Sequence, residues 1–245
     1  MIIPAFDELE NLKVLLPGII DMQSLLPGIT LTPLVVLPTA APESEVAALA
    51  QLGAQVVIRT PTDSFGDAVR SGIRSIRDTT EFVIFMDADG SHSPTRIPTL
   101  VEHASQADVV VASRYTKGGR SDNSPLLKAM SIALNRAYSL VLGIKCKDVS
   151  TSYKLYKGRD LRQIVLECNN FDIVEEILFR VQDLKRPKKL SIVEVPDHFA
   201  QRGIGSTKRR LGPYIASYLW TLARLRFMNS RSKQPNSTRE ESSRS

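Results

Sequence analysis

The chain has 245 residues, 42% of them hydrophobic and 24% charged, which is an ordinary globular composition with room for one sizeable core, and we expect one domain. Its net charge is +6 and its basic residues concentrate late in the sequence, a distribution that suits phosphates, an anionic membrane surface or nucleic acid. No apolar run reaches transmembrane length, no signal peptide precedes the first strand, and two cysteines without a CxxC or Cys/His cluster argue against a zinc site, so we expect a cytoplasmic protein with reduced thiols.

Short apolar runs alternate with helical segments through the first half of the sequence. Asp7 fits a helix N-cap, and the residues after it have the spacing of an amphipathic helix that Pro17 and Gly18 should kink or break. Pro94 fits the first position of another helix. Successive βαβ units of this kind build an α/β fold with a doubly wound, mostly parallel sheet covered on both faces. We expect strands at 1–3, 34–37, 55–59, 82–86 and 108–112, and helices at 7–20, 43–52, 65–77 and 94–106.

The second half begins with a polar segment, 113–123, which is too long for a simple connection and which we expect to border the site. A long helix at 125–142 ends at Gly143, a residue that favours the end of a helix. Strand, helix and strand are expected at 151–156, 171–184 and 191–195, before a basic loop at 196–210. The chain therefore divides into a domain at 1–210, an amphipathic helix at 211–227 and a disordered polar tail at 228–245.

Two carboxylates follow the apolar strand at 82–86. Because ligands of an open α/β sheet bind at the carboxyl edge of its strands, Asp87 and Asp89 are placed to hold Mg²⁺ or Mn²⁺ and, through the metal, a diphosphate. The alternative is that this Asp-x-Asp-Gly segment is only a polar turn.

Several segments, taken in order, resemble the glycosyltransferase family 2 enzymes, and among them the polyprenyl-phosphate (dolichyl-phosphate) mannosyl- or glucosyltransferases. The similarity runs from residue 2 to about 225 and depends on the order and spacing of its motifs, since none is decisive alone. The matching pieces are IIPAFDE at 2–8, MDAD at 86–89, ASRY at 112–115, KGG at 117–119, the segments 148–156 and 171–178, and VEVP at 193–196 followed by Arg202, Ser206 and Lys208.

The resemblance implies a single-domain GT-A-like (nucleotide-diphospho-sugar transferase) fold and a set of site residues. The base and ribose would be held by Pro4, Phe6 and Glu8, with Asp87 and Ala88 beside them. The metal would be bound by Asp89, with Asp87 nearby and Ser91 where the family often has glutamine. The diphosphate or the acceptor phosphate would meet Arg114, Arg202 and Lys208. For these three the alternative is a solvated loop, although glycines at 203 and 205 favour a phosphate site.

The sequence departs from the family after its second strand. The family has an acidic segment there that reads the base, whereas this chain has VVLPTAAP at 35–42. Without that carboxylate, base recognition would fall to Phe6 and backbone groups, and we expect GDP and UDP affinities to differ by less than roughly tenfold.

The resemblance favours an inverting transfer of a hexose, with mannose preferred, from a nucleotide sugar of the GDP-mannose or UDP-glucose class to a polyprenyl phosphate. A catalytic role is expected for Asp89 and Arg114. A family 2 enzyme with a hydroxyl acceptor would need a base, for which Glu176 and Glu175 are candidates unless they lie on a solvated helix face. A third possibility is a catalytically weak homologue that acts as a binding or regulatory subunit.

The partners follow from the same reading. The helix at 211–227 would either lie in a membrane interface or pack on the core, so we expect peripheral contact with the cytoplasmic face of a membrane, or a membrane subunit. Nucleic acid is the weakest candidate partner, because the basic loop lacks interleaved aromatic residues.

Overall fold

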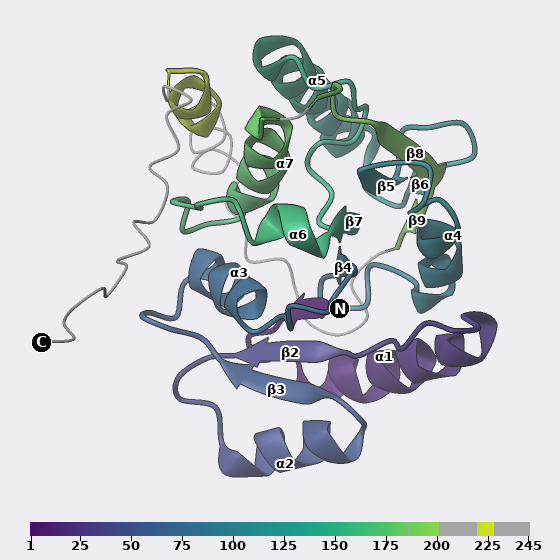
Figure 1. Ribbon diagram of the computed structural model, residues 1–245, viewed down its shortest axis with the longest axis vertical. Coiled ribbons are helices and arrows are strands. Elements are labelled where there is room, and N and C mark those ends of the chain that lie inside the picture. The colour runs from purple at the N-terminus through teal and green to yellow at the C-terminus, as the bar shows by residue number, and fades with distance from the viewer. Residues whose placement is uncertain (186, 201–219, 228–245) are drawn as a thin grey trace, which may run out of the picture.

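The centre of the molecule is a seven-stranded sheet with the strand order β3-β2-β1-β4-β7-β5-β8, seen in a computed structural model that describes residues 1–185, 187–200 and 220–227 (Figure 1). All neighbouring strands pair in parallel except β7, which runs antiparallel to both β4 and β5. The mostly parallel sheet confirms the expected fold class. Its strands are β1 (Ile2–Pro4), β2 (Leu34–Leu37), β3 (Gln55–Ile58), β4 (Phe82–Phe85), β5 (Val109–Ser113), β7 (Lys154–Lys157) and β8 (Ile192–Pro196).

Helices cover both faces of this sheet. Alternate residues of a strand point to opposite faces, so Val109 and Val111 belong to one apolar cluster and Val110 to the other. The helices sort in the same way by the cluster that their buried residues join (Figure 1). One cluster includes α3 (Phe65–Arg74), α5 (Pro125–Leu142), α6 (Gly158–Leu161) and α7 (Ile173–Asp183); the other includes α1 (Leu9–Asp21), α2 (Glu43–Gln51) and α4 (Ile97–Glu102).

The start and the interior of α1 differ from the sequence-based expectation. Asp7 is not the N-cap: its φ is 58°, and Glu8 takes the cap position without a side-chain cap bond. Helix α1 also continues past Pro17 to Asp21. A proline costs a helix about 3 kcal/mol, but burying each large apolar side chain on the same helix stabilises it by about 1.5–3 kcal/mol. The buried residues that hold α1 on both sides of the proline are Leu12, Leu15, Leu16 and Ile19.

Other differences are shorter elements. Helix α3 ends at Arg74, and the segment expected as one helix from Pro94 divides into the 3₁₀ turn η2 (Pro94–Arg96) and α4, which ends at Glu102. A second 3₁₀ turn, η1 (Met22–Leu25), follows α1. The two polar loops contribute strands too short to be recognised in the sequence, β6 (Arg120–Ser121) and β9 (His198–Phe199), which pair in parallel with each other.

Residues 220–227 are helical and pack on the domain through Leu222 and Leu225, while Trp220 and Phe227 are exposed. The rest of the helix expected at 211–227, the basic residues Arg202 and Lys208 and the tail at 228–245 lie outside the described residues. Among the residues that the structure does describe, no helix is both long enough and apolar enough to span a bilayer.

Candidate active site

A cleft of about 290 Å³ opens at the carboxyl edge of the sheet, where β1, β3 and β4 end. Since the carboxyl ends of parallel strands meet at one edge, segments far apart in the sequence come together there. The cleft contains six residues that the sequence assigned to nucleotide or metal: Pro4, Phe6, Glu8, Asp87, Ala88 and Asp89. It also contains five that the sequence analysis did not name for this site: Ala5, Arg59, Asp63, Phe65 and Phe171.

Arg59 joins three of the segments that form the cleft. Its side chain is buried, and its guanidinium donates hydrogen bonds to the main-chain carbonyls of Ala5, Val36 (3.3 Å) and Asp63 (3.1 Å). The guanidinium carbon also lies 5.8 Å from the ring centre of Phe6. Arg59 therefore fixes the ends of β1 and β2 relative to the loop before α3, and leaves the Phe6 side chain exposed for stacking.

The Asp-x-Asp motif follows the carboxyl end of β4, and its second carboxylate is held by hydrogen bonds from a buried serine. Ser91 is buried, and both its hydroxyl (2.5 Å) and its backbone N–H (3.0 Å) donate to Oδ1 of Asp89. These contacts engage Ser91 with Asp89, and the expected place of Ser91 among the metal ligands stays a prediction.

The described residues contain no group of three or more His, Cys, Asp or Glu side chains that could hold a metal alone. The hard carboxylate oxygens of Asp87 and Asp89 nevertheless suit Mg²⁺ or Mn²⁺, since Mg²⁺ is usually bound by one or two carboxylates, with water and substrate phosphates completing the shell. The donor set fits a divalent ion that binds together with a diphosphate.

His92 is a site residue that the sequence analysis missed, because the three histidines of the chain are far apart in sequence. It is buried behind the Asp-x-Asp motif, with Nε2 lying 3.8 Å from Oδ2 of Asp87 and 3.4 Å from the Ser152 hydroxyl. On its other side, Nδ1 lies 3.3 Å from Oδ2 of the buried Asp197. Its place three residues after Asp89 was the only signal in the sequence.

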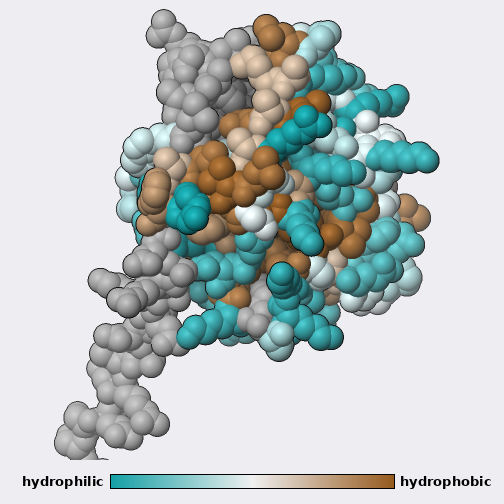
Figure 2. Space-filling view, turned by 90° about the horizontal axis from the view of Figure 1, so that it is seen from above, coloured by the Kyte–Doolittle hydropathy of each residue, from teal (hydrophilic) through white to brown (hydrophobic). Residues whose placement is uncertain are grey.

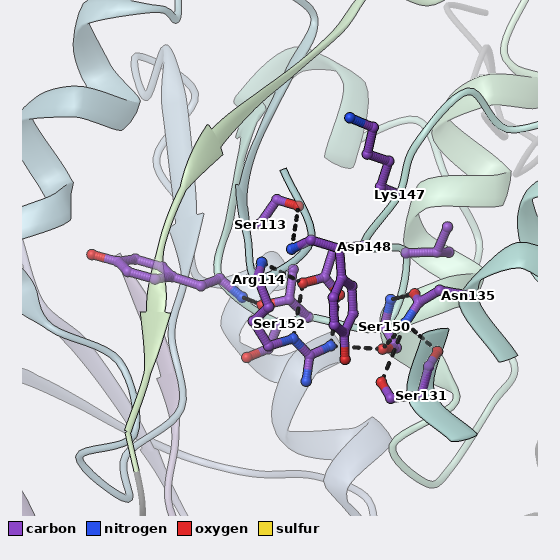
Figure 3. A network of polar contacts seen from close by, with 12 residues as sticks. Ser113, Arg114, Ser131, Asn135, Lys147, Asp148, Ser150 and Ser152 are labelled. Atoms are coloured by element: carbon purple, nitrogen blue, oxygen red, sulfur yellow. Dashed lines mark hydrogen bonds and ion pairs between the residues drawn. The ribbon is translucent and has the colours of Figure 1, made fainter. Parts of the chain in front are cut away.

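Arg114 does not line the cleft and lies in a network of polar contacts with other residues (Figure 3). Its guanidinium forms a two-pronged pair with the buried Asp148, at 2.8 Å from Nε and 2.6 Å from a terminal nitrogen, and also donates to Ser150 at 2.9 Å. Asn135 of α5 bonds Ser150 in turn. The phosphate role expected for Arg114 gains no support from these contacts, which hold the segment before β7 against α5 and the end of β5.

The two glutamates considered as bases, on α7, are both fully buried. The Glu176 carboxylate accepts hydrogen bonds from the backbone N–H groups of Glu167 (3.0 Å) and Cys168 (2.8 Å), and from Arg180 (3.4 Å). Among the residues that the structure describes, the Glu175 oxygens have no hydrogen-bond partner, and burial raises the pKa of Glu175 to about 8. Neither residue lines the cleft, and Glu176 fits a structural role better than a catalytic one.

Comparison with known proteins finds a family model and several sequence relatives that match this chain. The family model described as glycosyl transferase family 2 matches residues 1–165. An undecaprenyl-phosphate mannosyltransferase of Micrococcus luteus is 29% identical over 84% of this chain and 85% of its own length. A polyprenol monophosphomannose synthase of Mycolicibacterium smegmatis is 26% identical over 85% of this chain and 79% of its own length. A dolichol-phosphate mannosyltransferase of Pyrococcus furiosus is 28% identical over 92% of this chain and 62% of its own length.

Solved structures with the same fold are more distant in sequence. A crystal structure of a mycobacterial protein aligns with a TM-score of 0.70 at 16% identity, over 91% of this chain and 72% of that one. Glucosyl-3-phosphoglycerate synthase from Mycobacterium tuberculosis, in complex with Mg²⁺ and uridine diphosphate, aligns with a TM-score of 0.64 at 17% identity, over 96% of this chain and 79% of that one. At these identities the likeness establishes the shared fold.

Proposed function

The chain belongs to glycosyl transferase family 2, and from this premise we propose that it transfers mannose from a nucleotide sugar to a polyprenyl phosphate with inversion at the anomeric carbon. The relatives named above as polyprenyl-phosphate, polyprenol and dolichol-phosphate mannose enzymes support this choice of sugar and acceptor.

The observation that carries the proposal is the convergence of separate motifs on one cleft. The residues after β1 and those after β4 are about eighty positions apart in sequence, yet Phe6 and Glu8 line the same cleft as Asp87 and Asp89. An exposed ring, a carboxylate for ribose hydroxyls and a pair of carboxylates for a metal-bound diphosphate are the groups that a nucleotide sugar requires.

Each side chain then has a distinct task in the proposed reaction. Phe6 stacks on the base and Glu8 accepts hydrogen bonds from the ribose. Arg59 holds the end of β1, after which these residues follow, and the end of β2 against the loop before α3. A divalent ion held by Asp87 and Asp89 supplies positive charge to the diphosphate leaving group when bound. Ser91 orients the Asp89 carboxylate from the buried side, where His92 lies 3.8 Å from the Asp87 carboxylate.

The chemistry favours a phosphate acceptor over a hydroxyl acceptor. An ionised lipid phosphate oxygen can form its bond to the anomeric carbon while the bond from that carbon to the nucleoside diphosphate breaks, so no protein base is needed. A hydroxyl acceptor would need a base, and the buried Glu176 is held by backbone N–H groups away from the cleft.

A lipid acceptor also requires an apolar approach to the protein. Figure 2 looks onto the end of the molecule that carries α5 and α7 in Figure 1, and hydrophobic side chains gather across the middle of this face. Helix α5 exposes the apolar side chains Leu126, Leu127, Leu140 and Val141. We assign peripheral contact with the cytoplasmic face of a membrane to this end of the domain.

The proposal is tested by incubating the protein with radiolabelled sugar nucleotides, GDP-mannose and UDP-glucose among them, and a short polyprenyl phosphate. We expect label from GDP-mannose to enter the lipid phase with wild type and to fall at least a hundredfold with Asp89→Asn. The control, Asp78→Asn, changes an exposed aspartate after α3 at the opposite edge of the sheet and should keep wild-type transfer. Transfer of label only to saccharide acceptors would replace the lipid acceptor, and absence of transfer with every donor would reject the activity.

A further inference from the structure

The loop after β2 and the loop after β3 lie side by side at the carboxyl edge of the sheet, and they bring a carboxylate to the place where the sequence lacks one (Figure 1). Thr39 occupies the segment after β2 in which the family carries its acidic residues. Asp63, from the loop after β3, accepts hydrogen bonds at 2.8 Å from both the backbone N–H and the hydroxyl of Thr39. One oxygen of the carboxylate takes each bond, so the group is held in a fixed orientation.

Asp63 is also anchored through its backbone. Arg59 donates a hydrogen bond at 3.1 Å to the main-chain carbonyl of Asp63, and the same guanidinium lies over the ring of Phe6. The side chain of Asp63 is exposed and lines the cleft with Phe6. The hydrogen bonds from Thr39 lower the pKa of Asp63, so its carboxylate is ionised at neutral pH.

We propose that Asp63 reads the base of the donor nucleotide and selects guanine, an inference that rests on the proposed function only in requiring a nucleotide in this cleft. Each carboxylate oxygen can accept two hydrogen bonds, and Thr39 provides one to each. A carboxylate oxygen that accepts one bond from Thr39 can accept a second from the N1–H group of guanine, with the N2 amino group of the base within reach of the same oxygen. Uracil offers a single N–H between two carbonyls, and adenine and cytosine place an acceptor nitrogen beside their amino group.

This inference replaces the weak base selectivity expected from the sequence. A hydrogen bond to a charged group contributes roughly tenfold to hundredfold in affinity, and a base that presents an acceptor to the carboxylate loses both bonds and adds repulsion. The selecting group is therefore retained in this chain but is supplied by the strand next to the one that carries it in the family.

Calorimetry with GDP, inosine diphosphate (IDP), UDP and ADP tests the inference directly. IDP keeps N1–H but lacks the N2 amino group, so wild type should bind GDP at least tenfold more tightly than IDP, and IDP more tightly than ADP. Asp63→Asn should bring the GDP to IDP ratio close to one, because an amide still pairs with Thr39 but presents a single acceptor oxygen. Thr39→Val should reduce the same ratio by releasing one oxygen of the carboxylate. Asp78→Asn should leave the ratio unchanged.

The wild-type comparison of GDP with IDP needs no variant and decides the matter even if a substitution prevents folding. Affinities within threefold for the four nucleotides, absence of binding by all four, or an unchanged ratio in folded Asp63→Asn would each overturn the role of Asp63. The transfer assay separates this outcome from the activity: transfer of mannose without base selection leaves the proposed function and rejects Asp63 as the reader. Selective GDP binding without transfer leaves Asp63 as the reader and rejects the proposed transfer.

Discussion

Replacing Glu176 with alanine distinguishes a structural carboxylate from a catalytic base. The side chain is fully buried on α7, and its oxygens accept hydrogen bonds from the backbone N–H groups of Glu167 and Cys168 and from Arg180. Alanine removes all of these acceptors at once. Glu167 and Cys168 lie between α6 and α7 and do not line the cleft, although Phe171 of the same segment does. The substitution should therefore lower the stability of the fold and leave the chemistry of the remaining folded protein intact.

The size of the effect follows from the two backbone donors. A buried N–H group left without an acceptor costs about 1–3 kcal/mol, and the N–H group of Cys168 is buried whereas the N–H group of Glu167 is partly exposed. Arg180 retains a contact with Glu167 at 3.4 Å, so its loss is smaller. We expect the free energy of unfolding to fall by about 2–4 kcal/mol. With a urea m-value of about 3 kcal/mol per molar, the unfolding midpoint falls by about 1 M.

Urea unfolding followed by circular dichroism measures this shift, with mannose transfer measured on the same folded samples. Glu102→Ala, at the exposed end of α4, is the control and should change the free energy of unfolding by less than about 0.5 kcal/mol. Glu176→Gln, which keeps one acceptor oxygen, should lie between wild type and alanine. A wild-type unfolding midpoint for Glu176→Ala together with a hundredfold loss of kcat would refute the reasoning and restore Glu176 as a base.

Three further changes probe other parts of the account. Burial raises the pKa of Glu175 to about 8, above its value in the unfolded chain, so the folded state holds an extra proton between about pH 5 and 8. The free energy of unfolding should therefore fall by up to about 1.4 kcal/mol per pH unit as the pH rises through this range. Glu175→Met should flatten this slope in urea unfolding from pH 5 to 8, and an unchanged slope would show that other groups cause it. Mn²⁺ should tighten GDP binding to wild type but not to Asp89→Ala in calorimetry, whereas equal wild-type affinity with and without the ion would remove the metal role. Asp148→Asn removes the buried carboxylate that pairs with the partly buried Arg114 and should cost about 3 kcal/mol, lowering Tm by roughly 6–12 °C, and an unaltered Tm would contradict the importance of this pair.

The strands and longer helices could be predicted because their apolar spacing is local information. Helix α5 has the predicted bounds, Pro125–Leu142, since a proline after a capping serine starts it and Gly143, with a φ of 67°, ends it. The direction of β7 could not be predicted, because an apolar run shows burial and not polarity. Its place between β4 and β5 depends on pairing across the sheet with residues far away in sequence.

The same distinction applies to the site. Phe6 and Asp87 directly follow strands of a parallel sheet, so their approach to one edge follows from the fold class. The roles of Asp63 and His92 depend on partners 24 and 105 positions away, Thr39 and Asp197, which no local pattern reveals. For Glu176, likewise, the sequence context does not reveal that its carboxylate accepts hydrogen bonds from the backbone of the preceding loop.

The configuration of the reaction product tests the central claim most directly. GDP-mannose carries an α-linked mannose, and direct attack by the lipid phosphate in the Asp89 cleft inverts that centre. Nuclear magnetic resonance of the mannosyl phosphate lipid made by the wild-type protein should therefore show a β linkage, with no such product made by Asp89→Asn. An α-linked product would exclude direct attack from the face opposite the nucleotide, and β-linked product made equally well by Asp89→Asn would place the reaction outside this cleft.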